Sequence, residues 1–312
     1  MTKIAIVGSG LIGRAWATIF ASHGFEVALH DVKQEAAKAA RAHIGKNLKE
    51  LAGHGLVEDP AGSLERIRVA TDLADALRGV ALVQENGPET IEAKQALFAE
   101  MDRLAPKNAI LASSTSFIIA SRFSENLPGR ARCLVAHPVN PPHLVPIVEL
   151  APAPWTDPAV VEKARKIYEK AGQVPILLKK ELPGFVLNRL QAVLLAEAFR
   201  IVGAGVASPQ DVDKTIRDGL GLRWSFMGPF ETIELNAPGG IPDYCSRYGK
   251  SLTDMANSAT GGDPFGAETV AKVMEDWGAV SSPERVAALS NWRDTRLAAL
   301  KAHKRDARKK PK

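Results

Sequence analysis

The sequence predicts an α/β protein in which a doubly wound sheet is followed by a smaller, all-helical C-terminal domain. Three observations support this fold class. An apolar strand at 3–7 runs straight into a glycine-rich turn, and 14–23 then has a helical pattern. Apolar strand-like runs alternate with helical stretches as far as residue 182. Beyond that point the strand signal disappears, and apolar residues recur at helical spacing.

The glycine-rich turn, Gly8-Ser9-Gly10-Leu11-Ile12-Gly13, predicts a dinucleotide site. Gly8 permits the tight strand-to-helix turn, Gly10 allows the backbone to approach a pyrophosphate, and Gly13 allows the helix to pack closely on the strand. The first helical residues, Leu11 and Ile12, offer unpaired N–H groups to the phosphates. The first domain is therefore expected to be Rossmann-like. A glycine turn in some other α/β protein is the structural alternative.

A second strand at 26–30 ends at Asp31, 18 residues beyond Gly13. An acid at this place binds the adenosine ribose hydroxyls and repels the 2′-phosphate of NADP, which favours NAD. Lys33 could attract that phosphate, so these residues alone leave NADP open.

The remaining elements follow in order. Strands are expected at 3–7, 26–30, 67–70, 80–84, 109–112, 132–136 and 146–150, and later helices at 185–202, 209–219, 266–277 and 283–303. The helix at 34–52 is long for a crossover connection, which leaves open whether it projects from the domain. We expect a NAD-binding domain at 1–182 and a helical substrate and dimerisation domain at 183–312.

Composition predicts an ordinary cytoplasmic enzyme-sized protein. The chain has 312 residues, of which 46% are hydrophobic and 24% charged, and no apolar run approaches the roughly 20 residues of a membrane span. No signal peptide is evident, and no membrane partner is expected. Cys133 and Cys245 lack metal-ligand spacing, so we expect free thiols and no metal site.

Several basic residues lie in the last dozen positions, from Lys301 to Lys312, within a net charge of +5. No groove-reading or aromatic pattern accompanies them, so a frayed, solvated helix end is expected rather than a nucleic-acid site. The mild positive field suits a small anionic substrate.

The chemistry is expected where the first domain ends. The strand at 132–136 stops at His137, and the proline-rich segment 138–142 then holds an irregular loop. Glu149 lies in an otherwise apolar strand, where an unpaired charge would be costly. A His137–Glu149 pair would satisfy that charge and create an oriented general base. The spacing equally allows His137 to cap a strand while Glu149 points to solvent.

Four segments resemble ordered motifs of the 3-hydroxyacyl-CoA dehydrogenase superfamily. They are Ser113-Ser114-Thr115-Ser116, His137-Pro138-Val139-Asn140-Pro141-Pro142, Val148-Glu149, and Pro183-Gly184-Phe185-Val186-Leu187-Asn188-Arg189. A narrower similarity to the lambda-crystallin group of L-gulonate 3-dehydrogenases is carried by HPVNPP at 137–142, GFVLNRLQ at 184–191, GPFET at 228–232, LNA at 235–237 and NWRD at 291–294. The resemblance covers nearly the whole chain.

This resemblance implies NAD as the cofactor, a homodimer formed through the helical domain, and four catalytic residues. His137 would be the general base and Glu149 would orient it, while Ser116 and Asn188 would hydrogen-bond the substrate oxygen as it becomes a carbonyl. The alternatives are that Ser116 is a turn hydroxyl and that Asn188 faces the domain interface.

The resemblance also completes the expected cofactor set. Glu89, after Gly87-Pro88, and Lys94 fall where the family contacts the nicotinamide half of NAD, and Asn140 is assigned to the same set.

The substrate expectation depends on Arg223, which precedes Met227-Gly228-Pro229 and which fatty acyl-CoA members usually lack. A guanidinium can bind a free carboxylate bidentately, as L-gulonate oxidation to 3-dehydro-L-gulonate would need. A surface salt bridge is the alternative for Arg223. L-carnitine stays open, although its trimethylammonium group calls for an aromatic cage and Trp224 alone is thin support.

Three further functions are weighed. Dehydrogenation of a 3-hydroxyacyl-CoA and a non-catalytic, crystallin-like structural role both stay open, since fold does not fix function. A serine hydrolase is disfavoured, because no GxSxG elbow is present and the glycine-rich turn would lack a purpose.

Overall fold

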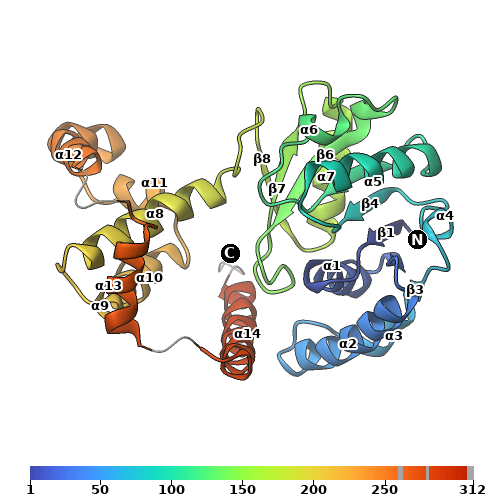
Figure 1. Ribbon diagram of the computed structural model, residues 1–312, viewed down its shortest axis with the longest axis horizontal. Helices are drawn as coiled ribbons and strands as arrows, with labels where there is room; N and C mark the ends of the chain where they lie inside the picture. The colour runs from blue at the N-terminus through green and yellow to red at the C-terminus, as the bar shows by residue number, and fades with distance from the viewer. Residues whose placement is uncertain (259–262, 279–280, 308–312) are drawn as a thin grey trace. The chain divides into compact units, whose positions relative to one another are not determined.

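The computed structural model describes residues 1–258, 263–278 and 281–307, which divide into two compact units (Figure 1). Unit 1 comprises Met1–Asn188 and Pro283–Lys312, and unit 2 comprises Arg189–Ser282. The last helix, α14 (Pro283–Ala307), thus belongs by its contacts to unit 1, although its sequence position suggested the helical domain.

Unit 1 contains an eight-stranded sheet with the order β3-β2-β1-β4-β5-β6-β7-β8. The strands are β1 (Lys3–Val7), β2 (Glu26–His30), β3 (Ile67–Val69), β4 (Leu82–Glu85), β5 (Ile110–Ser113), β6 (Cys133–Pro138), β7 (Ile147–Pro152) and β8 (Val174–Leu177). All seven expected strands are present, with small shifts at their ends.

Two features of the sheet were not predicted. β7 runs antiparallel to β6, because the short connection between them is a loop rather than the helical crossover that a parallel pair requires. β8 is an edge strand that contains Pro175 and leaves Ile176 and Leu177 exposed, so its sequence lacks the pattern of a buried strand.

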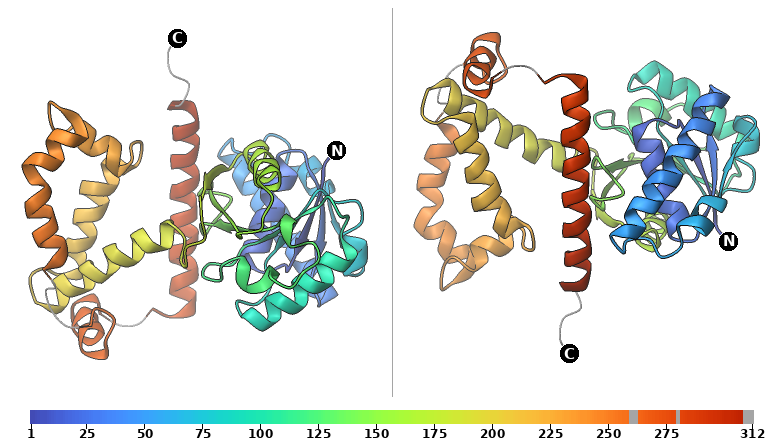
Figure 2. Two further views of the ribbon diagram at one scale, coloured as in Figure 1. Left: turned by 90° about the horizontal axis from the view of Figure 1, so that it is seen from above. Right: turned by 90° about the horizontal axis from the view of Figure 1, so that it is seen from below.

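The sheet is buried on both faces, as a doubly wound fold requires (Figure 2). Successive side chains of β1 alternate between the two faces. Ile4 and Ile6 pack with α1 (Leu11–Ser22), α2 (Gln34–Gly53) and α7 (Pro158–Lys170). On the opposite face, Ala5 and Val7 pack with α4 (Leu73–Ala76), α5 (Ile91–Leu104) and α6 (Ser121–Ser124).

The long helix α2 does not project from the domain. Its Ile44 and Leu48 are fully buried, and it packs along α1 and α3 (Pro60–Glu65). Its length is therefore used to cover one face of the sheet.

Every regular element in the described residues of unit 2 is a helix (Figure 2). It contains α8 (Leu187–Gly203, beginning in unit 1), α9 (Pro209–Lys214), a π-helical turn (Thr215–Leu220), α10 (Gly221–Trp224), α11 (Pro229–Glu234), α12 (Gly240–Asn257) and α13 (Ala267–Trp277). The predicted all-helical second domain is thus confirmed, and α10, α11 and α12 are additional helices that were not predicted. No helix in the described part of the chain is long and apolar enough to cross a membrane.

The expectation of a frayed basic C-terminus is wrong as far as α14 extends. Ala298 is buried in the core of unit 1, and the Lys301 amine donates a hydrogen bond to the His143 carbonyl at 2.8 Å. Arg305 donates to the Gly55 carbonyl. Packing of the helix on unit 1 orders these basic residues, whereas the rest of the expected tail, residues 308–312, lies outside the described residues.

His143 should make the fold sensitive to acid. Burial lowers its pKa to about 4, and its Nδ1 has no hydrogen-bond partner. Because the unfolded chain binds this proton near pH 6.5, stability should be lost as the pH falls from about 6.5 to about 4, by at most about 3 kcal/mol. Urea unfolding should show a smaller acid loss for His143→Gln. His303→Gln, at an exposed position of α14, is the control, and equal acid loss in both variants would contradict the assignment.

Candidate active site

The turn after β1 forms a cradle at the carboxyl edge of the sheet. Gly8 has a φ of +92°, and a Cβ there would lie 2.6 Å from the Asn86 carbonyl oxygen. A Cβ on Gly13 would lie 1.9 Å from the Gly8 oxygen, whereas a Cβ on Gly10 would meet nothing within 4 Å. Gly8 and Gly13 are therefore required by the turn itself, and Gly10 faces open space.

The residues of this cradle fit a dinucleotide. The first turn of α1, Leu11-Ile12-Gly13, carries no side-chain cap at Gly10, so its N–H groups remain available to an anion. The chain moves from β1 to β2 and β3 on one side and returns to β4 on the other. This reversal of strand order is where doubly wound folds bind nucleotides.

Asp31 stands at the end of β2 as an ionised acceptor. Its Oδ2 accepts hydrogen bonds from the Ser9 backbone and hydroxyl at 2.9 and 2.7 Å, and its Oδ1 accepts one from the Lys33 N–H at 3.1 Å. Burial raises the pKa of Asp31, but these hydrogen bonds outweigh burial and hold the pKa below its usual value. The carboxylate is thus charged and oriented beside the glycine turn.

The His137–Glu149 pair exists and is buried. The two residues lie opposite each other in the antiparallel β6–β7 register, and His137 Nδ1 is 2.9 Å from Glu149 Oε2. Their exposed fractions are 4% and 1%. The pair therefore excludes the alternative in which Glu149 points to solvent. Within the described chain, His137 Nε2 has no hydrogen-bond partner.

Glu149 is held in its ionised form. Burial raises its pKa, but the hydrogen bond from His137 and those from the Leu187 and Val186 N–H groups, at 3.0 and 2.8 Å, outweigh burial and lower it. An ionised Glu149 accepts from Nδ1–H, which leaves the Nε2 lone pair of a neutral His137 free to take a proton.

Phe185 adopts a left-handed backbone conformation that places the following N–H groups at Glu149. This residue is fully buried, its ring centroid lies 5.2 Å from that of His137, and its φ is +52°. A left-handed non-glycine residue costs roughly 1–3 kcal/mol. The turn directs the next two N–H groups, of Val186 and Leu187, onto the Glu149 carboxylate.

Ser116 and Asn188 also come together. The Asn188 side-chain amide donates to the Ser116 carbonyl at 2.9 Å, which joins the end of β5 to the start of α8. Ser116 Oγ has no hydrogen bond to any described residue. Because Leu187 is bonded to Glu149, the four residues expected to be catalytic lie in one connected network.

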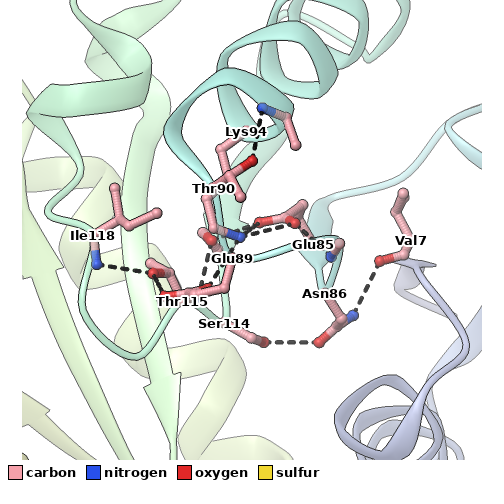
Figure 3. Close-up of polar contacts among 12 residues, drawn as sticks. Val7, Glu85, Asn86, Glu89, Thr90, Lys94, Ser114, Thr115 and Ile118 are labelled. Atoms are coloured by element: carbon pink, nitrogen blue, oxygen red, sulfur yellow. Dashed lines mark hydrogen bonds and ion pairs between the residues drawn. The ribbon is translucent and has the colours of Figure 1, made fainter.

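Glu89 and Lys94 make contacts inside the protein that were not predicted for cofactor ligands (Figure 3). Glu89 Oε1 accepts from the N–H groups of Ser116 and Phe117 at 3.0 and 3.2 Å, and from the Thr115 hydroxyl. Lys94 is 1% exposed, and its amine lies 3.6 Å from Glu89 Oε2.

The other expected ligand residues are exposed. Asn140 lies in the loop after β6. Arg223 lies on α10 of unit 2, and among the described residues no carboxylate is within salt-bridge distance of it. The salt-bridge alternative therefore finds no partner there.

Sequence reasoning missed Glu85, which is fully buried at the end of β4 and paired with Lys94. The sequence contained a signal for it, because Glu85 ends the otherwise uncharged strand Leu82–Glu85. A charge there needs a partner, as the charge of Glu149 does. Among the described residues, no group of three or more His, Cys, Asp or Glu side chains could hold a metal ion.

A nucleotide cradle beside a buried histidine–carboxylate pair at the carboxyl ends of a doubly wound sheet defines the class of nicotinamide-dependent dehydrogenases. Residues 3–182 match the 3-hydroxyacyl-CoA dehydrogenase NAD-binding domain, and residues 184–261 match the C-terminal domain of the same family. The chain belongs to the 3-hydroxyacyl-CoA dehydrogenase family, and its cofactor is NAD.

Individual relatives agree with this family. A lambda-crystallin homolog of Rattus norvegicus is 40% identical and is aligned over 95% of this chain and 94% of its own. L-carnitine dehydrogenase of Pseudomonas putida is 34% identical and is aligned over 96% of this chain and 93% of its own. The solved structure of 5-formyl-3-hydroxy-2-methylpyridine 4-carboxylic acid 5-dehydrogenase, an NAD-dependent dismutase, has a TM-score of 0.82 at 29% identity over 96% and 97%.

Gly10→Ala should weaken cofactor binding, whereas Gly13→Ala should lower the stability of the fold. Gly10→Ala adds a methyl group to space that the protein leaves open, so the melting temperature should be unchanged while the NADH dissociation constant rises at least about tenfold. Gly13→Ala collides with the Gly8 backbone and should destabilise unit 1. Thermal unfolding and NADH fluorescence titration measure both. Unchanged NADH affinity in Gly10→Ala would contradict the prediction that the pyrophosphate binds in this cradle.

Proposed function

We propose that this protein is an NAD-dependent dehydrogenase that oxidises the 3-hydroxyl of a small hydroxy acid, with L-gulonate, converted to 3-dehydro-L-gulonate, as the preferred substrate. The observation that carries the proposal is the buried His137–Glu149 pair, in which the His137 Nε2 has no hydrogen-bond partner among the residues that the structure describes. Such a pair is a general base, and alcohol oxidation needs one within hydrogen-bond reach of the hydroxyl.

Each side chain has a defined task in this reaction. Bound NAD supplies the hydride acceptor. His137 removes the hydroxyl proton at Nε2, and Glu149 holds the Nδ1–H and stabilises the imidazolium that forms. The Ser116 hydroxyl donates to the substrate oxygen as the carbonyl develops. Asn188 uses one N–H on the Ser116 carbonyl and retains a second for that oxygen.

The cofactor set follows the cradle. Gly8, Gly10 and the first turn of α1 would hold the pyrophosphate, and Asp31 would bind the ribose hydroxyls. We assign Glu89, Lys94 and Asn140 to the nicotinamide side, on the resemblance to the family.

Two substrates share the chemistry that this proposal requires. L-gulonate and L-carnitine each carry a carboxylate and a 3-hydroxyl. Similarity to lambda-crystallin homologs favours the first, and similarity to an L-carnitine dehydrogenase keeps the second as the alternative. A 3-hydroxyacyl-CoA lacks the free carboxylate that Arg223 would bind, and the catalytic network argues against a purely structural role.

A substrate panel tests the function. Reduction of NAD should be fastest with L-gulonate among L-gulonate, L-carnitine and 3-hydroxybutyryl-CoA. His137→Asn should lower kcat about 10²–10⁴-fold, because the proton acceptor is lost. The melting temperature serves as the folding control. Preference for L-carnitine would reassign the substrate, and full activity of His137→Asn would overturn the mechanism.

Arg223 is proposed to bind the substrate carboxylate. Arg223→Met should raise KM for L-gulonate at least about tenfold with a small change in kcat, because the lost contact is made in the ground state as well. Arg217→Met is a matched control, since Arg217 is exposed and pairs with Asp218. Steady-state kinetics measure both variants. An unchanged KM in Arg223→Met would exclude the carboxylate role.

We also propose a homodimer formed through unit 2. Of its described aliphatic and aromatic side chains only Val202, Pro209 and Ala237 are buried. In contrast, Val193, Phe226 and Phe230 are 71, 74 and 72% exposed. Apolar surface of this kind marks an interaction site. Light scattering should give twice the chain mass of 33.4 kDa, and a monomer mass at micromolar concentration would contradict the dimer.

A further inference from the structure

A fully buried carboxylate, Glu85, lies at the end of β4 and has no role in the mechanism above (Figure 3). The Lys94 amine donates to its two oxygens at 3.2 and 3.1 Å. The Ser113 hydroxyl and the Gly87 N–H each donate to it at 2.5 Å. A buried charge with this many donors is a fixed point of the structure, because moving it would leave several groups unsatisfied.

Lys94 connects this fixed point to a second carboxylate. It stands in the first turn of α5, almost without exposed surface, and lies 3.6 Å from Glu89 Oε2. One ammonium thus serves two carboxylates. If Glu85 lost its charge, the ammonium would be left with Glu89 alone, and the position of the Glu89 carboxylate would change with it.

Glu89 in turn holds the segment that carries Ser116. Its Oε1 accepts from the Thr115 hydroxyl and from the N–H groups of Ser116 and Phe117. A second route joins the same two places, because Ser113 donates to Glu85 and accepts from the Thr115 N–H at 3.2 Å. Both routes begin at Glu85. The first ends at the N–H groups of Ser116 and Phe117, and the second ends at the N–H of Thr115, the residue before Ser116.

We propose that Glu85 is a positioning residue, which fixes Lys94 and Glu89 and thereby sets the Ser116 hydroxyl at the reacting oxygen. This inference rests on the proposed role of Ser116. It assigns Lys94 a task inside the protein in addition to any contact with the cofactor. Because Glu89 and Lys94 are also assigned to the nicotinamide side of the cofactor, loss of Glu85 is expected to change NADH affinity as well, and the positioning role is tested on kcat at saturating NAD.

A double-mutant cycle tests the proposal. Glu85→Gln should lower kcat at least about tenfold in the wild-type background and less than about threefold in a Ser116→Ala background, because Glu85 acts through Ser116. All four enzymes are compared at saturating NAD, so that a change in cofactor affinity does not enter kcat. If Glu85→Gln does not fold, Thr115→Val takes its place, because it removes one donor to Glu89 and keeps the buried charges of Glu85 and Lys94. Its loss of kcat should depend on Ser116 in the same way.

Asp102→Asn is the matched control. Asp102 lies on the same helix as Lys94 and forms a buried ion pair with Arg132 at 2.7 Å, near the start rather than the end of β6. Its loss should lower stability and leave kcat unchanged. Independently of turnover, hydrogen exchange of the Ser116 and Phe117 amides should accelerate in Glu85→Gln and not in Asp102→Asn.

The outcomes separate the two proposals. Wild-type kcat in Ser116→Ala would overturn the proposed role of Ser116. A slow Ser116→Ala enzyme combined with additive losses in the cycle, or with wild-type kcat in Glu85→Gln, would overturn the positioning role alone. Unchanged exchange at Ser116 and Phe117 in folded Glu85→Gln would also overturn the positioning role.

Discussion

The hydrogen bond between His137 and Glu149 is the interaction on which the rest of the site depends. A carboxylate with an exposed fraction of 1% must be satisfied from inside the protein. Glu149, in β7, accepts from the imidazole of His137 in β6 and from the N–H groups of Val186 and Leu187, where α8 begins, so three separate segments meet at one side chain. The requirement to satisfy this charge therefore also orients the general base.

The same physical requirement operates a few strands away. Glu85 lies at the end of β4 and Glu149 lies in β7. Each buried carboxylate accepts hydrogen bonds from donors in different segments and so fixes the positions of these donors. The Asn188 amide and the Glu89 carboxylate then hold the Ser116 segment from two sides. Buried charges with several donors resist small displacements, because every donor loses its partner at once. Such rigidity suits a reaction that needs a hydroxyl and a base at fixed separation.

Much of the fold could be predicted because it depends on local patterns. Alternating apolar residues located seven strands, and helical periodicity located α2, α8 and α14. The eighth strand escaped because an exposed edge strand with a proline has no apolar signature. The contacts of α2 and α14 escaped for a different reason. Periodicity shows that a helix has a buried face, but it does not show what covers that face.

The sequence by itself determined the glycine cradle and the Asp31 acceptor, and it indicated the pairing of His137 with Glu149 as one of two possibilities, between which the structure decided. These features follow from steric limits at single residues, or from the cost of one charge in an apolar strand. Only the tertiary structure decided that Phe185 adopts a left-handed backbone, that Asn188 bonds the Ser116 carbonyl, and that Glu85 shares Lys94 with Glu89. These contacts depend on strand order and register, which bring together residues that no local pattern relates.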